Sequence, residues 1–251
     1  MRGAAIGSGI PFRGAVKTLI ILNVAIWLVL QVVVGKMILG NMGAITQYLG
    51  LIPGLVIGKG FVWQVFTYQF LHSLDPFHIL FNMLILWWFG AELEQRWGTK
   101  FFVKYYLACG FGAGAIYVVG YGVWAMITGN ITHLVSPVVG ASGAVFGLLM
   151  AYGILFSERT IYFMMMFPLK AKQFIWIIAG IEILYMITGA QSGVANLAHL
   201  GGFATGFVIL SYIARKKQKN RGPKSNKRGG PQLKLVVDND KADDDGPKYW
   251  N

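Results

Sequence analysis

The chain has 251 residues, of which 55% are hydrophobic and 13% charged, and its mean hydropathy is +0.56. Soluble globular domains carry about twice that share of charged residues, so this class is excluded. The formal net charge of +12 invites a nucleic-acid interpretation, but the positions of the basic residues explain the charge without nucleic acid. The single cysteine, Cys109, excludes an internal disulfide and a cysteine-built metal cluster.

Six apolar segments are candidates for helices that cross a hydrocarbon core of roughly 30 Å; they are 15–35, 76–95, 101–123, 141–157, 172–189 and 193–214. If the N-terminus is cytoplasmic, 20 of the 22 Lys and Arg residues lie in cytoplasmic segments, and only Lys36 and Lys59 lie outside. This distribution follows the positive-inside rule. We therefore expect a multi-pass protein of the lipid bilayer, in a bacterial plasma membrane, with both termini cytoplasmic and no nucleic-acid partner.

The N-terminal part of the chain is expected to be a short cytoplasmic lead-in, residues 1–14, followed by a membrane domain over residues 15–214. The lead-in lacks the apolar core and cleavage site of a signal peptide, so the first helix is expected to remain as an anchor. The connection over residues 35–75 is too long for a tight turn and too apolar for a solvated loop. Because it mixes Trp and Tyr with aliphatic residues, we expect it to lie half-sunk in the outer leaflet.

The second helix has a clear start at Asp75-Pro76, where the carboxylate can cap the helix and proline suits its first position. His78 and Asn82 follow, and their spacing of four places them on one face. Gly98 is expected to end this helix. The third helix is expected over residues 101–122, and no group of polar side chains in it suggests a functional site.

The fourth helix begins in a run of small residues, 139–147, that contains Ser142. From Ser142 to Phe156 there are 15 residues, about 22 Å of helix, which is shorter than the hydrocarbon core. Because the charged pair Glu158-Arg159 pins the inner end, Ser142 should lie below the outer surface. A serine among small residues is either a packing residue or a nucleophile, and its neighbours at that depth decide between the two.

The last two helices carry the remaining candidates. Glu182 is an ionisable group at membrane depth and hence a functional candidate, but with no acidic or basic partner expected at matching depth, a structural, hydrogen-bonded role is favoured. His199 lies about 9 Å into the last helix. The spacing Gly202-x-x-x-Gly206 indicates close packing against the fourth helix.

The tail, residues 215–251, is basic and then acidic and is expected to be disordered. Its basic half is expected to lie near anionic headgroups.

Helices two, four and six run in the same direction, so their outer ends lie at one level. Their unusual polar groups all fall there: His78 and Asn82, Ser142, and His199. A serine hydroxyl becomes a nucleophile when an imidazole takes its proton, and the resulting oxyanion needs hydrogen-bond donors. Ser142 and His199 can form the dyad. His78, Asn82 and the backbone amide of Ser142 can form the oxyanion hole.

At these residues the chain resembles the rhomboid family of intramembrane serine proteases. The resemblance rests on Gly140-Ala141-Ser142-Gly143, on His78-x-x-x-Asn82, and on Ala198-His199-Leu200-Gly201-Gly202 with Gly206. It implies an all-α, six-helix membrane bundle with a membrane-embedded loop between the first two helices. It further implies Ser142 as nucleophile, His199 as base, His78 and Asn82 as oxyanion donors, and no cofactor or metal. Single-pass membrane proteins would be cleaved near the outer face, with the fifth helix and the loop before the sixth moving to admit them.

Two positions vary from the family pattern. Trp63-Gln64 stands where Trp-Arg is frequent, which leaves the anchoring of the outer loop open. Phe146 occupies a position where Tyr or Phe stacks on the base histidine, so the stacking role is retained.

Two alternative functions remain open. One is a rhomboid-like scaffold that binds transmembrane helices without cutting them. The other is a small-molecule carrier, for which the sequence shows no paired half-helices or repeat.

Overall fold

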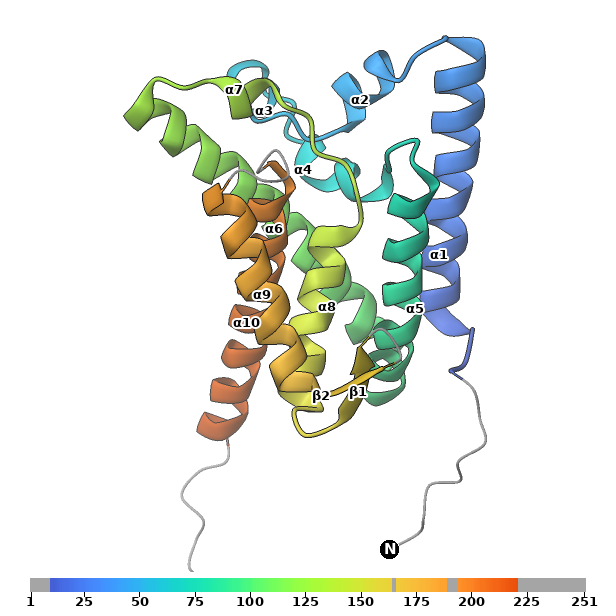
Figure 1. Ribbon diagram of the computed structural model, residues 1–251, viewed down its shortest axis with the longest axis vertical. Coiled ribbons are helices and arrows are strands. Elements are labelled where there is room, and N and C mark those ends of the chain that lie inside the picture. The colour runs from blue at the N-terminus through green and yellow to red at the C-terminus, as the bar shows by residue number, and fades with distance from the viewer. Residues whose placement is uncertain (1–9, 164–165, 189–193, 221–251) are drawn as a thin grey trace, which may run out of the picture. The chain divides into compact units, whose positions relative to one another are not determined.

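The computed structural model describes residues 10–163, 166–188 and 194–220. In this part the chain is a bundle of long helices with one short β-hairpin (Figure 1). The elements are α1 Gly14–Ile26, the π-helix η1 Trp27–Ile38, α2 Gly43–Leu49, α3 Pro53–Lys59, α4 Gln64–Thr67, the 3₁₀ turn η2 Tyr68–Phe70, α5 Pro76–Trp97, α6 Thr99–Thr128, α7 Thr132–Val135, α8 Ser142–Leu155, β1 Thr160–Phe163, β2 Phe167–Lys170, α9 Ala171–Thr188 and α10 Val194–Asn220.

Five helices in the described residues are long and apolar enough to cross a membrane; they span Gly14–Ile38, Pro76–Trp97, Thr99–Thr128, Ala171–Thr188 and Ala195–Lys219. The sixth apolar helix, α8, has 14 residues, about 21 Å at 1.5 Å per residue. The predicted all-α membrane bundle with a short fourth helix is therefore confirmed. In Figure 1, the chain runs inward from α7 before α8 begins, so α8 starts inside the bundle.

Two helices run further than the sequence suggested. The helix α6 continues six residues beyond the expected end at residue 122, because the next residues are apolar and the left-handed glycine that ends it is Gly129, with φ of 71°. The helix α10 continues through the first basic residues to Asn220, although disorder was expected from residue 215. The rest of the expected tail, 221–251, lies outside the described residues. The chain divides into two units, 1–214 and 215–251.

A β-hairpin between α8 and α9 was not predicted. Strands β1 and β2 pair antiparallel, with Thr160 opposite Lys170, at the end of the bundle away from α2, α3, α4 and α7 (Figure 1). The carboxylate of Glu158 accepts hydrogen bonds from Lys170 Nζ at 2.6 Å and from Lys172, and these ammonium groups hold the pKa of Glu158 at about 2. The methionines at 164 and 165 lie outside the described residues.

The start and end of α5 follow the prediction. Asp75 Oδ1 accepts from the backbone N–H of Phe77 at 3.0 Å, and Pro76 occupies the first helical position. At the other end, Gly98 has φ of 78°, a conformation that favours glycine. These two signals fix where the face carrying His78 and Asn82 begins.

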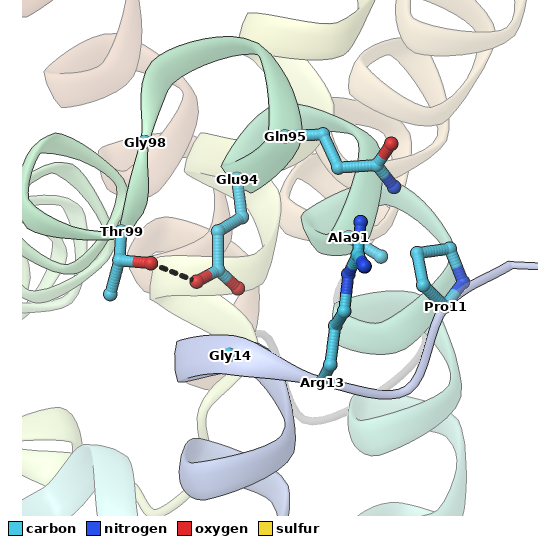
Figure 2. Close-up of a pocket in the computed structure, with 8 residues that line it drawn as sticks. All are labelled: Pro11, Arg13, Gly14, Ala91, Glu94, Gln95, Gly98 and Thr99. Atoms are coloured by element: carbon cyan, nitrogen blue, oxygen red, sulfur yellow. Dashed lines mark hydrogen bonds between the residues drawn. The ribbon is translucent and has the colours of Figure 1, made fainter.

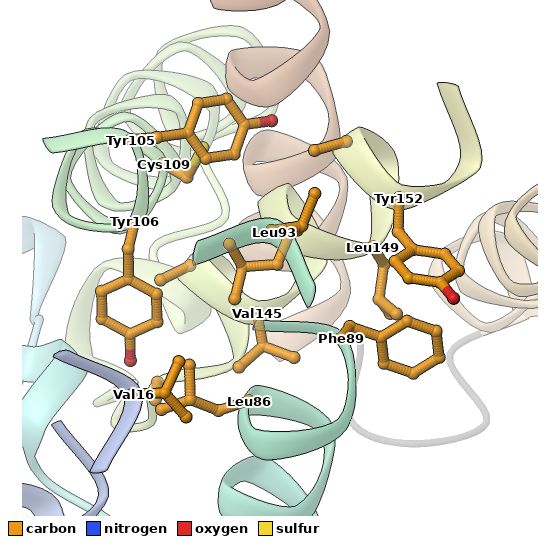
Figure 3. Close-up of a cluster of buried hydrophobic side chains, with 14 of the residues drawn as sticks. Val16, Leu86, Phe89, Leu93, Tyr105, Tyr106, Cys109, Val145, Leu149 and Tyr152 are labelled. Carbon is orange, nitrogen blue, oxygen red and sulfur yellow. The ribbon is translucent and has the colours of Figure 1, made fainter. Parts of the chain in front are cut away.

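The core is made where α1, α5, α6 and α8 meet. Figure 3 shows side chains of these four helices packed together, among them Val16, Leu86, Phe89, Leu93, Tyr105, Tyr106, Val145 and Leu149, all of them buried. Nine of the 14 residues of α8 are buried, which makes α8 the central helix of the bundle. Its outer end is therefore held by packing on several sides.

The outer segment, residues 39–75, is anchored by Gln64, which stands at the position that differs from the family pattern. Its side chain is completely buried. Its Oε1 accepts from the N–H of Ile52 at 3.0 Å and its Nε2 donates to the carbonyl of Gln47 at 2.7 Å. An antiparallel bridge between Leu51 and Val138 joins this segment to the chain that leads into α8. A buried amide thus provides the anchoring that the sequence left open.

The first turn of α1 is held by a carboxylate from α5. Glu94 Oε1 accepts from the N–H of Ala15 at 2.8 Å and from the Thr99 hydroxyl at 2.6 Å, and its Oε2 accepts from the N–H of Val16 at 3.0 Å. Figure 2 shows the Glu94 carboxylate beside Gly14 and Thr99. The first amides of a helix have no partner within the helix, so this buried carboxylate supplies one and ties α1 to α5.

We predict that Glu94→Ala destabilises the folded protein by about 1–3 kcal/mol, because two buried backbone amides lose their acceptor. The measurement is thermal unfolding in detergent micelles, compared with Glu158→Ala, which removes an exposed carboxylate. A Glu94→Ala protein as stable as the control would contradict this role.

Candidate active site

Helices α5, α8, α9 and α10 line a cavity of about 630 Å³ whose polar lining side chains are Asp75, His78, Asn82, Ser142, Glu182 and His199. Four of these are the candidates that the sequence placed at one depth. They come from three helices that are distant along the chain. The structure thus brings Ser142, His199, His78 and Asn82 to one cavity.

The Ser142 hydroxyl and the His199 imidazole are in direct contact. His199 Nε2 lies 2.9 Å from Ser142 Oγ, which is hydrogen-bond distance. Ser142 is the first residue of α8. Phe146, one turn further along, stacks on the imidazole with ring centroids 4.2 Å apart and planes 12° apart. Because the ring lies flat against Phe146, its rotation is restricted while Nε2 faces the hydroxyl.

Glycines set the distance between α10 and α8. A Cβ atom on Gly202 would clash with the carbonyl oxygen of Gly143. A Cβ atom on Gly206 would lie 3.1 Å from the carbonyl oxygen of Gly147, tighter than ordinary contact, and would also meet the Tyr105 hydroxyl. Small residues allow helix backbones to approach closely in membranes. Here that approach places His199 over the N-terminus of α8.

His78 is oriented by the turn that precedes α5. The N–H of Ser73 donates to His78 Nδ1 at 3.2 Å, and the Ser73 hydroxyl lies 3.0 Å from the same atom. A neutral imidazole that accepts at Nδ1 carries its proton at Nε2. A Cβ atom on Gly140, whose φ is 134°, would lie 2.9 Å from His78 Nε2 and 3.5 Å from Ser142 Oγ. His78 Nε2 and the serine hydroxyl therefore lie on the same side of Gly140.

Asn82 is buried one turn after His78. Its Nδ2 donates to the His78 carbonyl at 2.8 Å, which uses one of the two N–H groups of the amide. At the start of α8, the N–H of Ala141 donates to His72 Nε2 at 3.5 Å, and the amides of the first turn have no acceptor within the helix. Ser142 is in this first turn, so its backbone N–H is one of the amides that have no acceptor within the helix.

The expectation that Glu182 has no basic partner at its depth is wrong. Its Oε2 lies 3.0 Å from His199 Nδ1 and accepts from Asn196 Nδ2 at 2.6 Å. The sequence predicts only the pairing of His199 with Ser142, but an imidazole has two nitrogens that face opposite ways. Because α9 runs opposite to α10, Glu182 reaches the same depth as His199. The hydrogen bond that was expected for Glu182 is present, with Asn196 as its donor.

His72 lies beside the site, where it accepts from the N–H of Ala141, and was not predicted from the sequence. Its side chain is completely buried, its backbone N–H donates to Gln31 Oε1 at 2.7 Å, and its carbonyl accepts from the same amide. Its ring lies 5.3 Å from that of His78. Burial, with a smaller effect of His78, lowers the pKa of His72 from 6.5 to about 3. A histidine in an apolar outer segment, six residues before His78, was the available signal.

A fourth histidine lies apart from this cavity. His133 lies against the ring of Tyr121, with centroids 4.2 Å apart, and is not among the residues that line the cavity. Within the described ranges, no group of three or more His, Cys, Asp and Glu side chains is arranged to hold a metal ion. The loop before α10, residues 189–193, which was expected to move for substrate, lies outside those ranges.

Comparison with known proteins gives the family. The model of the Rhomboid domain family matches residues 59–216. The chain belongs to the rhomboid family. RHOMBOID-like protein 1 of Arabidopsis thaliana is 32% identical over 179 residues, which cover 70% of this chain and 41% of that protein. Rhomboid protease GluP of Bacillus subtilis is 29% identical over 165 residues, 64% of this chain and 28% of that protein.

A third relative is RHOMBOID-like protein 12, mitochondrial, of Arabidopsis thaliana, 29% identical over 198 residues, 66% of this chain and 59% of that protein. The matched part of the chain therefore covers about two fifths of RHOMBOID-like protein 1 and about three fifths of RHOMBOID-like protein 12. The similar proteins include plant and mitochondrial rhomboids. They support a multi-pass integral membrane protein, and they do not support the expected bacterial plasma membrane.

The low pKa of His72 predicts an acid-sensitive fold. The folded protein keeps this ring neutral while the unfolded chain takes up a proton, so its contribution to stability is present above pH 6.5 and is lost as the pH falls toward 3. We predict that the free energy of unfolding in detergent falls more steeply from pH 7 to pH 5 in the wild type than in His72→Gln, by up to about 1.4 kcal/mol per pH unit. Equal slopes would contradict this assignment.

Proposed function

We propose that this rhomboid protein is an intramembrane serine endopeptidase with Ser142 as nucleophile and His199 as general base. The observation that carries the proposal is the 2.9 Å contact between Ser142 Oγ and His199 Nε2 inside a cavity of the bundle. A hydroxyl is a weak nucleophile until a neighbouring base accepts its proton. An imidazole at hydrogen-bond distance supplies that base.

The proposed reaction has two halves. In the first, Ser142 Oγ attacks the carbonyl carbon of the scissile bond while its proton passes to His199 Nε2. The imidazolium then gives that proton to the nitrogen of the leaving amine, and the C–N bond breaks, which leaves an ester on Ser142. In the second half, a water molecule attacks the carbonyl carbon of the ester while His199 Nε2 takes one of its protons. The bond between that carbon and Ser142 Oγ then breaks, the imidazolium returns the proton to Oγ, and the carboxylic acid product leaves.

The negative charge on the carbonyl oxygen needs fixed donors. His78 Nε2–H, the second N–H of Asn82 and the backbone N–H of Ser142 are proposed for this role, which fits their place around one cavity. The N-terminus of α8 also carries a partial positive charge, because the peptide dipoles of a helix are aligned. Donors that are already positioned stabilise an oxyanion without reorganisation.

The proposed substrates are single-pass transmembrane proteins, cut near the outer face of the bilayer. The site lies at the outer end of a helix too short to span the hydrocarbon core, so water and a peptide segment can meet there. The proposed domain organisation is a membrane domain over residues 15–214 with the lead-in 1–14 and the tail 215–251 on the side rich in Lys and Arg.

We predict that Ser142→Ala abolishes cleavage of a transmembrane reporter while the protein still inserts and folds, because the nucleophile is lost. The matched control is Ser136→Ala, which removes a half-buried serine of the outer loop whose hydroxyl donates to the Thr132 carbonyl and which should keep wild-type cleavage. Cleavage retained in Ser142→Ala would exclude the proposed mechanism. A wild type that binds the reporter without cutting it would indicate the alternative function, a scaffold that binds transmembrane helices.

We predict that Asn82→Ala lowers kcat for the reporter by roughly 10²-fold or less, since one oxyanion donor among several is removed. The control is Asn41→Ala, an exposed asparagine of the outer segment. An Asn82→Ala enzyme with unchanged kcat would remove this residue from the oxyanion hole.

A further inference from the structure

Glu182 is an acidic side chain in a membrane-spanning helix, and its side chain is only 11% exposed. Acidic groups at this depth are costly and are retained where they have partners or a function. Neither the serine nucleophile nor the oxyanion donors require a carboxylate on α9. Its two contacts, to His199 Nδ1 and Asn196 Nδ2, converge on a single oxygen, Oε2.

We propose that Glu182 is a positioning residue for the general base. Its carboxylate keeps the proton of neutral His199 on Nδ1, so that Nε2 presents a lone pair to Ser142 Oγ, and it stabilises the imidazolium that forms when the serine proton arrives. This inference rests on the proposed serine protease function and adds a third member, from α9, to the Ser142–His199 pair.

The two nitrogens of the imidazole have different partners. A neutral ring carries one proton, and its position is set by the group that each nitrogen faces. An ionised carboxylate only accepts hydrogen bonds, so a carboxylate oxygen 3.0 Å from Nδ1 favours the form with the proton there. That form leaves Nε2 free to take the proton of Ser142, 2.9 Å away.

The contact between Glu182 and His199 is close but not aligned. Among the described residues, Nδ1 has no partner in good hydrogen-bond geometry, although Oε2 is at hydrogen-bond distance. Catalytic hydrogen bonds are often misaligned before substrate binds and tighten in the complex.

Asn196 fixes the carboxylate. It is buried, and it lies three residues before His199 on α10, so both side chains face the same side of the helix. Its amide donates to Oε2 at 2.6 Å and so holds that oxygen beside Nδ1. The same two contacts also tie α9 to α10. The competing explanation is therefore a tether that only holds the helices together.

Other ionisable groups could also act on the imidazole through their charge. Of the described residues that line this cavity, Asp75 and His78 are the remaining ionisable ones. Asp75 caps α5, and His78 bonds to Ser73. Both stay in place when Glu182 is replaced, so a difference between wild type and variant reports the carboxylate of Glu182.

The experiment measures the rate at which a fluorophosphonate probe labels the purified full-length protein in detergent between pH 5 and pH 9. Glu182→Gln is the central variant. Because both groups at Oε2 are donors, the glutamine will place its oxygen there, which keeps an acceptor and removes only the charge. Glu182→Leu removes the acceptor as well. Glu158→Gln is the matched control, since it removes an exposed carboxylate at the opposite end of the bundle.

For Glu182→Gln we expect half-maximal labelling to move to lower pH by about one unit or more, because an adjacent negative charge favours the protonated imidazole. Its plateau rate should fall by about 10-fold, since the imidazolium is no longer stabilised. For Glu182→Leu we expect a loss of roughly 10²-fold or more, because the proton is then free to occupy Nε2. Glu158→Gln should keep the wild-type profile.

The outcomes separate this inference from the proposed function. If Glu182→Gln labels with the wild-type midpoint, whether at full rate or uniformly more slowly, Glu182 is a tether and the inference is overturned, while Ser142 and His199 stand. If the wild type itself does not label at Ser142, the proposed function fails and the inference fails with it. A shifted midpoint in Glu158→Gln would show a general charge effect and would also overturn the assignment.

Discussion

The close approach of α10 to α8 is the contact on which the site depends. At Gly202 and Gly206, any side chain would meet the backbone of α8 at Gly143 and Gly147. Without water inside a bilayer there is little hydrophobic drive between helices, so small residues and good packing have to hold them together. Because the two backbones approach this closely, a histidine one turn before Gly202 reaches the hydroxyl at the start of α8.

Several buried polar side chains support this arrangement by making hydrogen bonds that lipid cannot supply. Glu94 supplies acceptors to the first turn of α1, and Gln64 and Gln31 bond to backbone groups of the outer segment. That segment carries His72, whose ring meets the amide of Ala141 just before the serine. The outer segment thus reaches the end of α8 that carries Ser142 through buried hydrogen bonds.

Much of this could be predicted from the sequence, for identifiable reasons. The start of α5 at Asp75-Pro76, the short α8 and the close-packing glycines each follow from a local rule about caps, length or side-chain size. The common depth of Ser142 and His199 followed from counting residues along helices of known direction. Residue types and spacing were enough because a membrane helix has a fixed rise and a fixed orientation.

Other features depend on contacts between segments that have no local signal. The pairing of Glu182 with His199 needs the rotation of α9 about its axis, which its all-round apolar sequence does not reveal. The anchoring by Gln64 and the burial of His72 depend on how the outer segment folds back on the bundle. The extra turns of α6 were missed because its apolar end offers no stop before Gly129.

The proposed function requires one activated serine at the outer end of α8. Mass-spectrometric peptide mapping of the protein after treatment with a fluorophosphonate tests this requirement. We expect a single adduct, on Ser142, which is lost when the protein is denatured before treatment. An intact, folded protein without an adduct, or with its adduct on another serine such as Ser73, would contradict it.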